Sequence, residues 1–276
     1  MKKHISYSEW KDWSICPFYH KLVHIDKLSG FEGNIYTAFG KALHETIEVD
    51  LTSKQVGDTG VMVENFQKFL KKEVKDLPQE EKERILSDFD IKEWLGQGTE
   101  IIQEVYGALV DRFGDYGTGW EVLAAEERLY EDIEYFDTKK KFKGFIDLVV
   151  YNKMDSKVYL IDWKTTSWGW DRKKKSDSTL AYQLAFYKYF YSEKYDVDMK
   201  DVETYFVLLK RTAKVGKKVE FVRVTSGPRR IENALNALKK AVYNIDRGNY
   251  IKNKLSCKSC PKRFGTCTFY NTEYCP

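Results

Sequence analysis

The first half of the chain carries apolar residues at the spacing of an amphipathic helix. Residues 4–51 predict two helices joined by a polar connection, and the second helix covers Thr37–Leu51. The same spacing continues over residues 60–113, where a highly charged stretch separates two apolar runs. The pattern therefore predicts N-terminal helices followed by a helical insert over residues 52–118.

From Gly119 onward the pattern changes to runs rich in Val, Ile, Phe and Tyr, which are typical of strands. A helix over Ser178–Lys194 divides these runs, and another helix follows Gly227. This order predicts a mixed α/β fold with a core sheet, flanked by helices, over residues 119–247. The predicted strands are Glu121–Tyr130, Lys143–Tyr151, Lys157–Thr165, Glu203–Lys210 and Lys218–Val224.

Composition limits the class of protein without identifying it. The chain has 276 residues, of which 42% are hydrophobic and 32% charged, so it can bury a sizeable core. It has no apolar run of about 18 residues and no N-terminal signal pattern, so we expect no membrane segment. A cytoplasmic location is the expectation, in a bacterium or in the host cell if the protein is viral. The net charge of +4 permits a nucleic-acid partner but does not by itself indicate one.

Two aspartates interrupt predicted apolar strands one hairpin apart. Asp147 lies in FKGFIDLVVY, and Asp162 lies in VYLIDWKTT, where alternation places Lys164 on the same face. A carboxylate inside an apolar strand is costly unless it is paired or bound to a metal. Two carboxylates on adjacent strands attract a hard divalent cation such as Mg²⁺, and a nearby lysine can stabilise an oxyanion or orient a water. Together these groups suit metal-assisted phosphodiester hydrolysis, whereas either site alone fits an ordinary edge ion pair equally well.

The five cysteines are unevenly placed, with Cys16 near the start and the other four close to the end. Cys257, Cys260 and Cys267 have the spacing of metal ligands, and Cys16 would supply a fourth thiolate from far away in the sequence. Four thiolates suit a four-iron cluster or a structural Zn²⁺, and the spacing alone leaves both open. Cys275 has no evident partner and is expected to be free.

Short motifs in a fixed order give the chain a resemblance to a known family. GFID and, fifteen residues later, IDWKTT resemble the signature of the PD-(D/E)XK nuclease superfamily. FGKALHETIE and AYQLAFYKYF resemble the histidine motif and the QxxxY motif of its RecB-like branch. The Cys-Pro of the opening segment and CKSCPKRFGTC near the end resemble the iron–sulfur members of that branch, which include AddB-type and CRISPR-adaptation nucleases. The motifs span residues 5–267, nearly the whole chain.

The resemblance implies a restriction-endonuclease-like core sheet and a role for each matching residue. His44, Asp147, Asp162 and the main-chain carbonyl of Trp163 would bind one or two Mg²⁺ or Mn²⁺ ions. Lys164 would help to activate the attacking water or stabilise the transition state. A lone histidine beside an apolar stripe also fits a packing role, and the metal role assigned to His44 depends on the resemblance.

Three more residues complete the implied catalytic set. Gln183 and Tyr187 lie four residues apart and share a helix face, so we expect them to contact substrate or orient the lysine. The same pair also fits a buried hydrogen bond. The branch often has an acidic residue on the strand before GFID, and we choose Glu126 in preference to Glu127. Glu127 is expected to be a solvated surface residue.

For the cysteines, the resemblance implies a [4Fe–4S] cluster in preference to Zn²⁺, with a structural role and an effect on nucleic-acid placement. We therefore expect one nuclease domain over residues 1–276, in which residues 248–276 form the cluster segment together with the first cysteine. The implied cluster ligands are Cys16, Cys257, Cys260 and Cys267.

Basic residues follow the strand that carries Lys164. A charge run is usually a solvated loop, but this one flanks a predicted catalytic strand and could neutralise phosphates. Trp168 and Trp170 just before it fit stacking on single-stranded bases as well as they fit a lid or packing. The predicted nucleic-acid contacts are Arg172, Lys173, Lys174 and Lys175.

These features predict a metal-dependent DNA nuclease, by the resemblance an exonuclease on single-stranded or free DNA ends. Repair, recombination or viral DNA processing would be its setting. The chain has no phosphate-binding loop of the GxxxxGK[ST] type, so any helicase or recombination activity would come from a partner protein. Two alternatives stay open: a catalytically silent subunit that binds DNA ends, and a zinc-containing nuclease that processes RNA.

Overall fold

The structure is a computed structural model that describes residues 3–28, 33–53, 56–134, 138–258 and 266–276. Its six strands form one mixed sheet in the order β1-β3-β4-β5-β6, with β2 paired to β3. The strands are β1 (His4–Ser6), β2 (Trp120–Asp132), β3 (Lys141–Asn152), β4 (Lys157–Thr166), β5 (Val202–Lys210) and β6 (Val219–Arg223). The helices are α1 (Tyr7–Ile15), α2 (Pro17–His20), α3 (Ile35–Leu51), α4 (Thr59–Lys75), α5 (Gln79–Asp88), α6 (Ile91–Phe113), α7 (Arg172–Lys175), α8 (Ser178–Tyr195) and α9 (Pro228–Asp246). Short helical turns complete the set: η1 (Lys21–Ile25), η2 (Met199–Asp201) and η3 (Lys254–Ser256).

The predicted mixed α/β class, with helices around a core sheet, is confirmed. One strand was missing from the prediction: β1 precedes the first helix and pairs in parallel with the start of β3, Ser6 opposite Lys143. A segment of three residues is too short to show the alternation that identifies a strand in a sequence. The charged stretch inside the insert forms a helix of its own, α5.

The chain divides into two compact units. Unit 1 comprises Met1–Phe31, Leu129–Gly144 and Gly227–Pro276, and unit 2 comprises Glu32–Arg128 and Phe145–Ser226. The expected single nuclease domain, with its insert over 52–118 and core over 119–247, stays a prediction.

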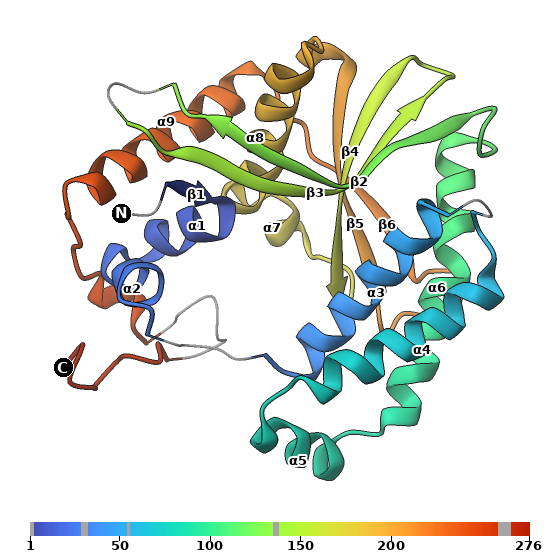
Figure 1. Cartoon of the computed structure of the whole chain (residues 1–276), viewed down its shortest axis with the longest axis horizontal. Helices are drawn as coiled ribbons and strands as arrows, with labels where there is room; N and C mark the ends of the chain where they lie inside the picture. The colour runs from blue at the N-terminus through green and yellow to red at the C-terminus, as the bar shows by residue number, and fades with distance from the viewer. Residues whose placement is uncertain (1–2, 29–32, 54–55, 135–137, 259–265) are drawn as a thin grey trace. The chain divides into compact units, whose positions relative to one another are not determined.

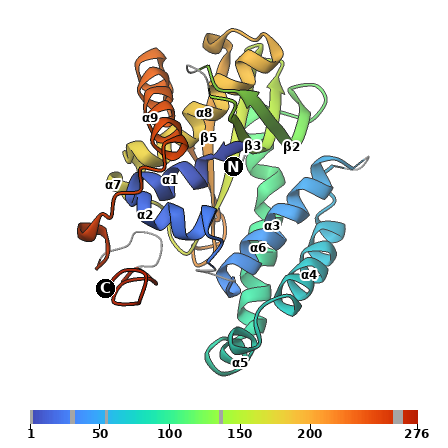
Figure 2. The ribbon, with the colours of Figure 1, turned by 60° about the vertical axis from the view of Figure 1, so that its left-hand side comes forward.

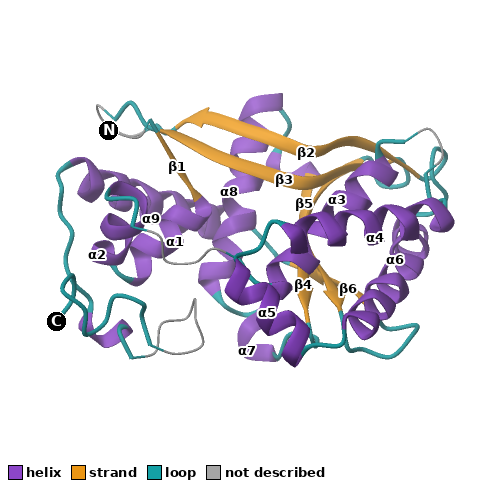
Figure 3. Ribbon diagram, turned by 60° about the horizontal axis from the view of Figure 1, so that its bottom comes forward, coloured by secondary structure: helices purple, strands orange, loops and turns teal. Residues whose placement is uncertain are grey.

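In unit 2 the strands present one apolar face to a helical layer. β3 and β4 form an antiparallel hairpin, whereas β4 and β5 run parallel, which requires the crossover that α8 supplies. Ile161 and Trp163 of β4 are buried in a core with residues of α3, α4 and α6. Figures 1 and 3 show these three helices gathered beside β4 and β6.

Aromatic packing fixes α3, the helix that carries the predicted histidine. Phe39 of α3 meets Phe66 of α4 and Trp94 of α6 edge to face, with ring centroids 5.6 and 5.3 Å apart. Such pairs stabilise a core beyond the burial of their area. A capping box between Asn34 and Thr37 begins the same helix. The position of α3 is therefore set both locally and by the core.

Unit 1 brings the two ends of the chain together. α1 packs against α9, as Figure 2 shows, and the Nδ2 atom of Asn253 donates to the Ile15 carbonyl at 2.8 Å. The segment that follows α9 is thereby tied to the end of α1. None of the described helices is both long and apolar enough to cross a membrane.

Candidate active site

Two strand residues bring carboxylates together where β3 and β4 pair. Leu148 lies opposite Ile161, so Asp147 and Asp162 are the next residues along the two strands. Oδ2 of Asp147 accepts a hydrogen bond from the main-chain amide of Trp163 at 2.7 Å. The side chain of one strand is thus fixed to the backbone of the other beside the second acid.

Asp162 is held from two directions. Its side chain is nearly inaccessible, and the residue is 3% exposed. The ammonium of Lys164, on the same strand face, lies 2.6 Å from Oδ2 and 5.4 Å from the centroid of the Phe206 ring. From α8, Nε2 of Gln183 donates to Oδ1 at 2.6 Å. Both carboxylate oxygens therefore have partners within unit 2.

Burial makes this pair of acids difficult to ionise together. Burial raises the pKa of Asp147 well above its usual value, and the charge of Asp162 raises it further, against the lowering effects of Lys164 and the Trp163 amide. Burial also raises the pKa of Asp162, while Lys164 lowers it. One lysine cannot balance two buried carboxylates, so the site favours a proton or a cation beside them.

His44 reaches the carboxylates from α3. Its Nδ1 atom lies 3.7 Å from Oδ2 of Asp147. Burial, followed by the charge of Lys164, lowers the pKa of His44 to about 4, so the ring is neutral near pH 7 and offers a lone pair. The helix passes close to β4 here, because a Cβ on Gly40 would lie 3.4 Å from the Thr165 hydroxyl.

Gln183 and Tyr187 lie on one face of α8, as their spacing predicts. Nε2 of Gln183 donates to the Tyr187 hydroxyl at 3.1 Å as well as to Asp162. Its Oε1 atom is buried without a hydrogen-bond partner among the described residues. Burial, and then the charge of Asp162, raise the pKa of Tyr187 well above its usual value, so its hydroxyl stays protonated.

The two glutamates of β2 lie in different surroundings. Glu127 is paired with Lys194 at 2.5 Å and accepts from the Tyr195 hydroxyl at 2.7 Å. It is therefore a partly buried ion-pair residue rather than the solvated one expected. Glu126 is exposed by comparison, and its pKa is raised by partial burial and then by the charges of Glu48 and Asp162. Its φ of 51° is left-handed, an uncommon conformation for a residue inside a strand.

Glu48 was missed by the sequence analysis. It lies one turn after His44 on α3, and its carboxylate raises the pKa of Glu126. Burial and Glu45 raise the pKa of Glu48 itself. The four-residue spacing from the histidine was the available signal, because such residues share a helix face.

The predicted basic run forms the short helix α7, and its four side chains are exposed. Lys175 pairs with Glu220 of β6 at 2.7 Å, and Lys174 lies 5.0 Å from the centroid of the Trp170 ring. The two tryptophans differ: Trp170 is 8% exposed and packs, whereas Trp168 is 68% exposed. Packing thus accounts for Trp170 but not for Trp168.

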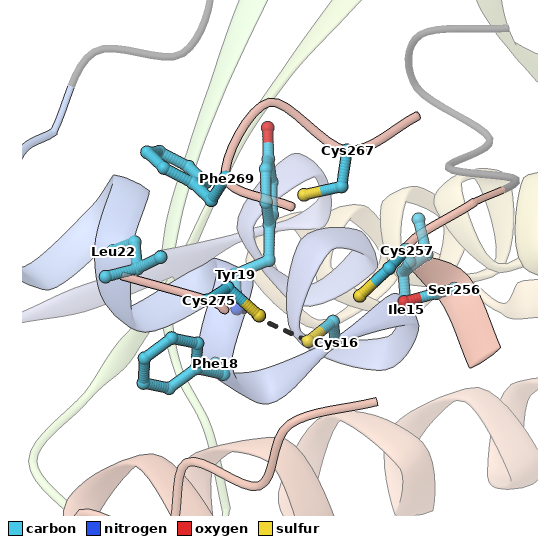
Figure 4. Close-up of a pocket in the computed structure, with 10 residues that line it drawn as sticks. All are labelled: Ile15, Cys16, Phe18, Tyr19, Leu22, Ser256, Cys257, Cys267, Phe269 and Cys275. Atoms are coloured by element: carbon cyan, nitrogen blue, oxygen red, sulfur yellow. Dashed lines mark hydrogen bonds between the residues drawn. The ribbon is translucent and has the colours of Figure 1, made fainter. Parts of the chain in front are cut away.

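A second group of reactive side chains lies in unit 1. Cys16, Cys257 and Cys267 line one pocket, and Figure 4 shows their thiols among apolar side chains. Burial raises the pKa of the Cys257 thiol, and neighbouring cysteines raise it further. The predicted ligand Cys260 lies outside the described residues. Cys275, which was expected to be free, forms no disulfide and lines the same pocket.

Local contacts place Cys16 in this pocket. It lies between α1 and α2, and its amide donates to the Asp12 carbonyl at 3.0 Å. Two histidine–carboxylate contacts tie the following turns back to α1, His20 to Glu9 at 3.0 Å and His24 to Asp12 at 2.8 Å. These contacts therefore fix the junction of α1 and α2, where the Cys16 thiol lies.

Within the part of the chain that the structure describes, no three His, Cys, Asp or Glu side chains are already arranged to hold a metal ion. At the carboxylates the contacts give the reason, because Lys164 and Gln183 occupy the oxygens of Asp162. A cation that binds Asp162 must replace at least part of these contacts. The carboxylate oxygens that could bind a cation are present, but those of Asp162 are paired with Lys164 and Gln183.

Comparison with solved structures supports the fold. A candidate exonuclease from Eubacterium rectale, known from a crystal structure, superposes with a TM-score of 0.56 at 13% sequence identity. The match covers 95% of this chain and 88% of the other. No curated protein matches the sequence.

A family comparison covers both candidate strands and the histidine helix. The sequence matches a family over residues 4–264, which include every residue discussed at the carboxylate site. The chain therefore belongs to the PD-(D/E)XK nuclease superfamily.

Proposed function

We propose that the protein is a metal-dependent deoxyribonuclease that acts as an exonuclease on single-stranded DNA ends. The observation that carries the proposal is the convergence of Asp147, Asp162, Lys164 and His44 where β3 and β4 meet. Members of this superfamily are nucleases that typically use a divalent metal, and this convergence supplies the groups for that chemistry.

The donors fit Mg²⁺ or Mn²⁺. Two carboxylates and the carbonyl of Trp163 are the oxygen ligands that these ions prefer, and neutral His44 adds a nitrogen that suits Mn²⁺. The buried acids also lack a full complement of positive charge, which a divalent ion would supply. When bound, the ion would polarise the phosphodiester and lower the pKa of the attacking water.

Three side chains have supporting roles in this proposal. Lys164 sits beside Asp162, where its charge can stabilise the oxyanion of the transition state or orient water. Gln183 holds the same carboxylate from α8 and so positions it, and the Tyr187 hydroxyl accepts a second hydrogen bond from the Gln183 amide. Glu126 of β2 would position a water or a second ion, which the effect of the Asp162 charge on its pKa supports.

The surface around α7 supports a nucleic-acid substrate. Arg172 and Lys173 are exposed on α7, and exposed basic side chains neutralise phosphates. Trp168 offers an aromatic face that bases of an unpaired strand can stack on. Lys174 and Lys175 carry further positive charge, although Glu220 partly balances it.

For unit 1 we propose a [4Fe–4S] cluster with a structural role, held by Cys16, Cys257, Cys260 and Cys267. The described thiols among these line one pocket, which suits a thiolate-bound group. Four thiolates also suit a structural Zn²⁺, and the preference for a [4Fe–4S] cluster comes from the resemblance to the iron–sulfur members of the RecB-like branch.

The test is cleavage of end-labelled single- and double-stranded DNA by anaerobically purified protein, with Mg²⁺, Mn²⁺ or EDTA. Cleavage should require the metal and should be lost in Asp147→Ala and Lys164→Ala, while Lys173→Ala should cleave with a weakened affinity. Release of mononucleotides from a labelled end identifies an exonuclease. DNA binding without cleavage by the unmodified protein would favour the catalytically silent alternative, and cleavage that survives EDTA or both substitutions would refute the mechanism.

A further inference from the structure

The pocket of unit 1 holds one cysteine more than the proposed ligand set uses there. The chain has five cysteines, and a [4Fe–4S] cluster takes four thiolates. Cys275 lines the pocket together with Cys16, Cys257 and Cys267, and Figure 4 shows its sulfur directed toward the other thiols. Cys275 is 7% exposed.

The backbone explains how the end of the chain reaches the pocket. The Cys267 amide donates to the Cys257 carbonyl at 2.7 Å, and the Tyr270 amide donates to the Cys267 carbonyl at 3.0 Å. A tight turn then folds the chain back, because the Asn271 amide donates to the Cys275 carbonyl at 2.9 Å. These hydrogen bonds, together with the peptide bond between Tyr270 and Asn271, link Cys257, Cys267 and Cys275.

The turn is specifically formed rather than a frayed end. Asn271 has a φ of 55°, in the left-handed region that asparagine tolerates better than most residues. The Cys275 amide and the Thr272 hydroxyl donate to the carbonyls of Thr272 and Phe269 at 3.0 and 2.7 Å. Phe269 is buried at the base of the turn. The last residues thus hold a thiol in place at some conformational cost.

The opposite wall of the pocket is prepared for a thiolate. Sγ of Cys16 lies 3.5 Å from the Tyr19 amide and 3.4 Å from the Asn253 amide, and both amides donate to it. Amide donors of this kind stabilise a metal-bound sulfur. Cys275 completes this wall from the C-terminal side, among Phe18, Leu22 and Phe269, which exclude water.

We infer that Cys275 is a thiolate ligand of the metal cluster in this pocket, alongside Cys16, Cys257 and Cys267. This inference rests on the cluster proposed above and revises its ligand set, with Cys275 in place of Cys260. Binding forms an iron–sulfur bond, and the thiol proton leaves to solvent, so the step needs no oxidant. A buried thiol on a hydrogen-bonded turn, in one pocket with three others, is better explained as a ligand than as a free cysteine.

The test compares iron and sulfide per chain, visible absorbance and the EPR spectrum after reduction in four anaerobically purified proteins. These are the unmodified chain, Cys275→Ser, Cys16→Ser as the positive control, and Glu273→Ser as the matched control on the same turn. Cys275→Ser should lose at least half of the iron or change the EPR signal, as Cys16→Ser does, while Glu273→Ser should match the unmodified chain. Full iron content with an unchanged spectrum in Cys275→Ser overturns the inference.

A second measurement on the unmodified chain does not depend on the folding of a variant. Alkylation of each cysteine is mapped by mass spectrometry before and after iron is removed. Cys275 should change from protected to labelled together with Cys16, and equal labelling in both states overturns the inference. If the unmodified chain contains no iron, the cluster proposal itself fails, whereas iron without protection of Cys275 refutes only the new ligand.

Discussion

At the scale of single residues, the sequence identifies the two acids that the structure brings together, but not all of their neighbours. Asp147 and Asp162 are detectable because a carboxylate in an apolar strand needs a compensating partner. Lys164 is detectable because the alternation of side chains along a strand places it on the same face as Asp162. Alternation also assigns Glu126 and Glu127 to opposite faces, but it does not distinguish their surroundings. The left-handed φ of Glu126 and the ion pair of Glu127 do so, and both arise from tertiary structure. The choice of Glu126 for the site stays a prediction.

The adjacent glutamates give a matched pair of variants. If Glu126 acts as proposed, Glu126→Gln should lower the rate of DNA cleavage about 10²-fold, as the loss of a positioned acid–base group does. Glu127→Gln removes only the pairing with Lys194 and should leave the rate within about twofold, with about 0.2–1 kcal/mol less stability. Single-turnover cleavage and urea unfolding measure both effects. Equal rates in the two variants would remove Glu126 from the site.

His44 gives a prediction for pH. Its pKa is lowered from 6.5 to about 4 in the folded protein, so between these values the unfolded chain binds a proton that the folded chain does not. Stability should therefore fall as the pH decreases from about 6.5 to about 4, by on the order of 2 kcal/mol, and this contribution should change no further below pH 4. Urea unfolding in EDTA at pH 7 and pH 5 measures the loss. His44→Gln should lose less stability over this range, and an identical loss in both proteins contradicts the assignment.

At the scale of elements, long periodic segments are predictable and short ones are not. Helices α3 and α8 and strands β4 and β5 lie within two residues of their predicted bounds, because each repeats its pattern several times. β1 and α7 are too short to show a period. The sequence pattern also does not show where two helices pack closely together. Gly98 of α6 gives no sequence signal that distinguishes it from Gly96, yet a Cβ at Gly98 would lie 2.1 Å from Phe66.

The glycines of α6 test how closely α4 and α6 must approach. Gly98→Ala should destabilise the protein by about 1–3 kcal/mol, because the new methyl group collides with the fully buried ring of Phe66. Gly96→Ala, with nothing within 4 Å, should stabilise by up to about 1 kcal/mol through helix propensity. Urea unfolding of both variants measures these changes in stability. A stable Gly98→Ala protein would mean that Phe66 can move, and that the core under α3 is looser than described.

At the scale of the molecule, each compact unit carries one candidate site. The carboxylate site lies wholly within unit 2, and the thiol pocket lies wholly within unit 1. The resemblance joined Cys16 to the C-terminal segment, but sequence alone could not assign Leu129–Gly144, from the middle of the chain, to the same unit. Only long-range contacts such as that between Asn253 and Ile15 show that the two termini share a pocket.

If the two sites are bound as proposed, their ligands should stabilise different parts of the chain. Mn²⁺ at about 100 times its Kd should add up to about 2.7 kcal/mol of protection from hydrogen exchange in α3, β4 and α8 of unit 2. Removal of iron should instead speed exchange in α1 and α9 of unit 1, because the proposed cluster ligands lie on the segments next to these helices. Hydrogen exchange followed by mass spectrometry separates the two effects, and Asp147→Ala should lose the first while keeping the second. If Mn²⁺ protected unit 1 as strongly as unit 2, the metal would not be binding at the carboxylates alone. The assignment of the divalent metal to unit 2 and of the cluster to unit 1 would then be wrong.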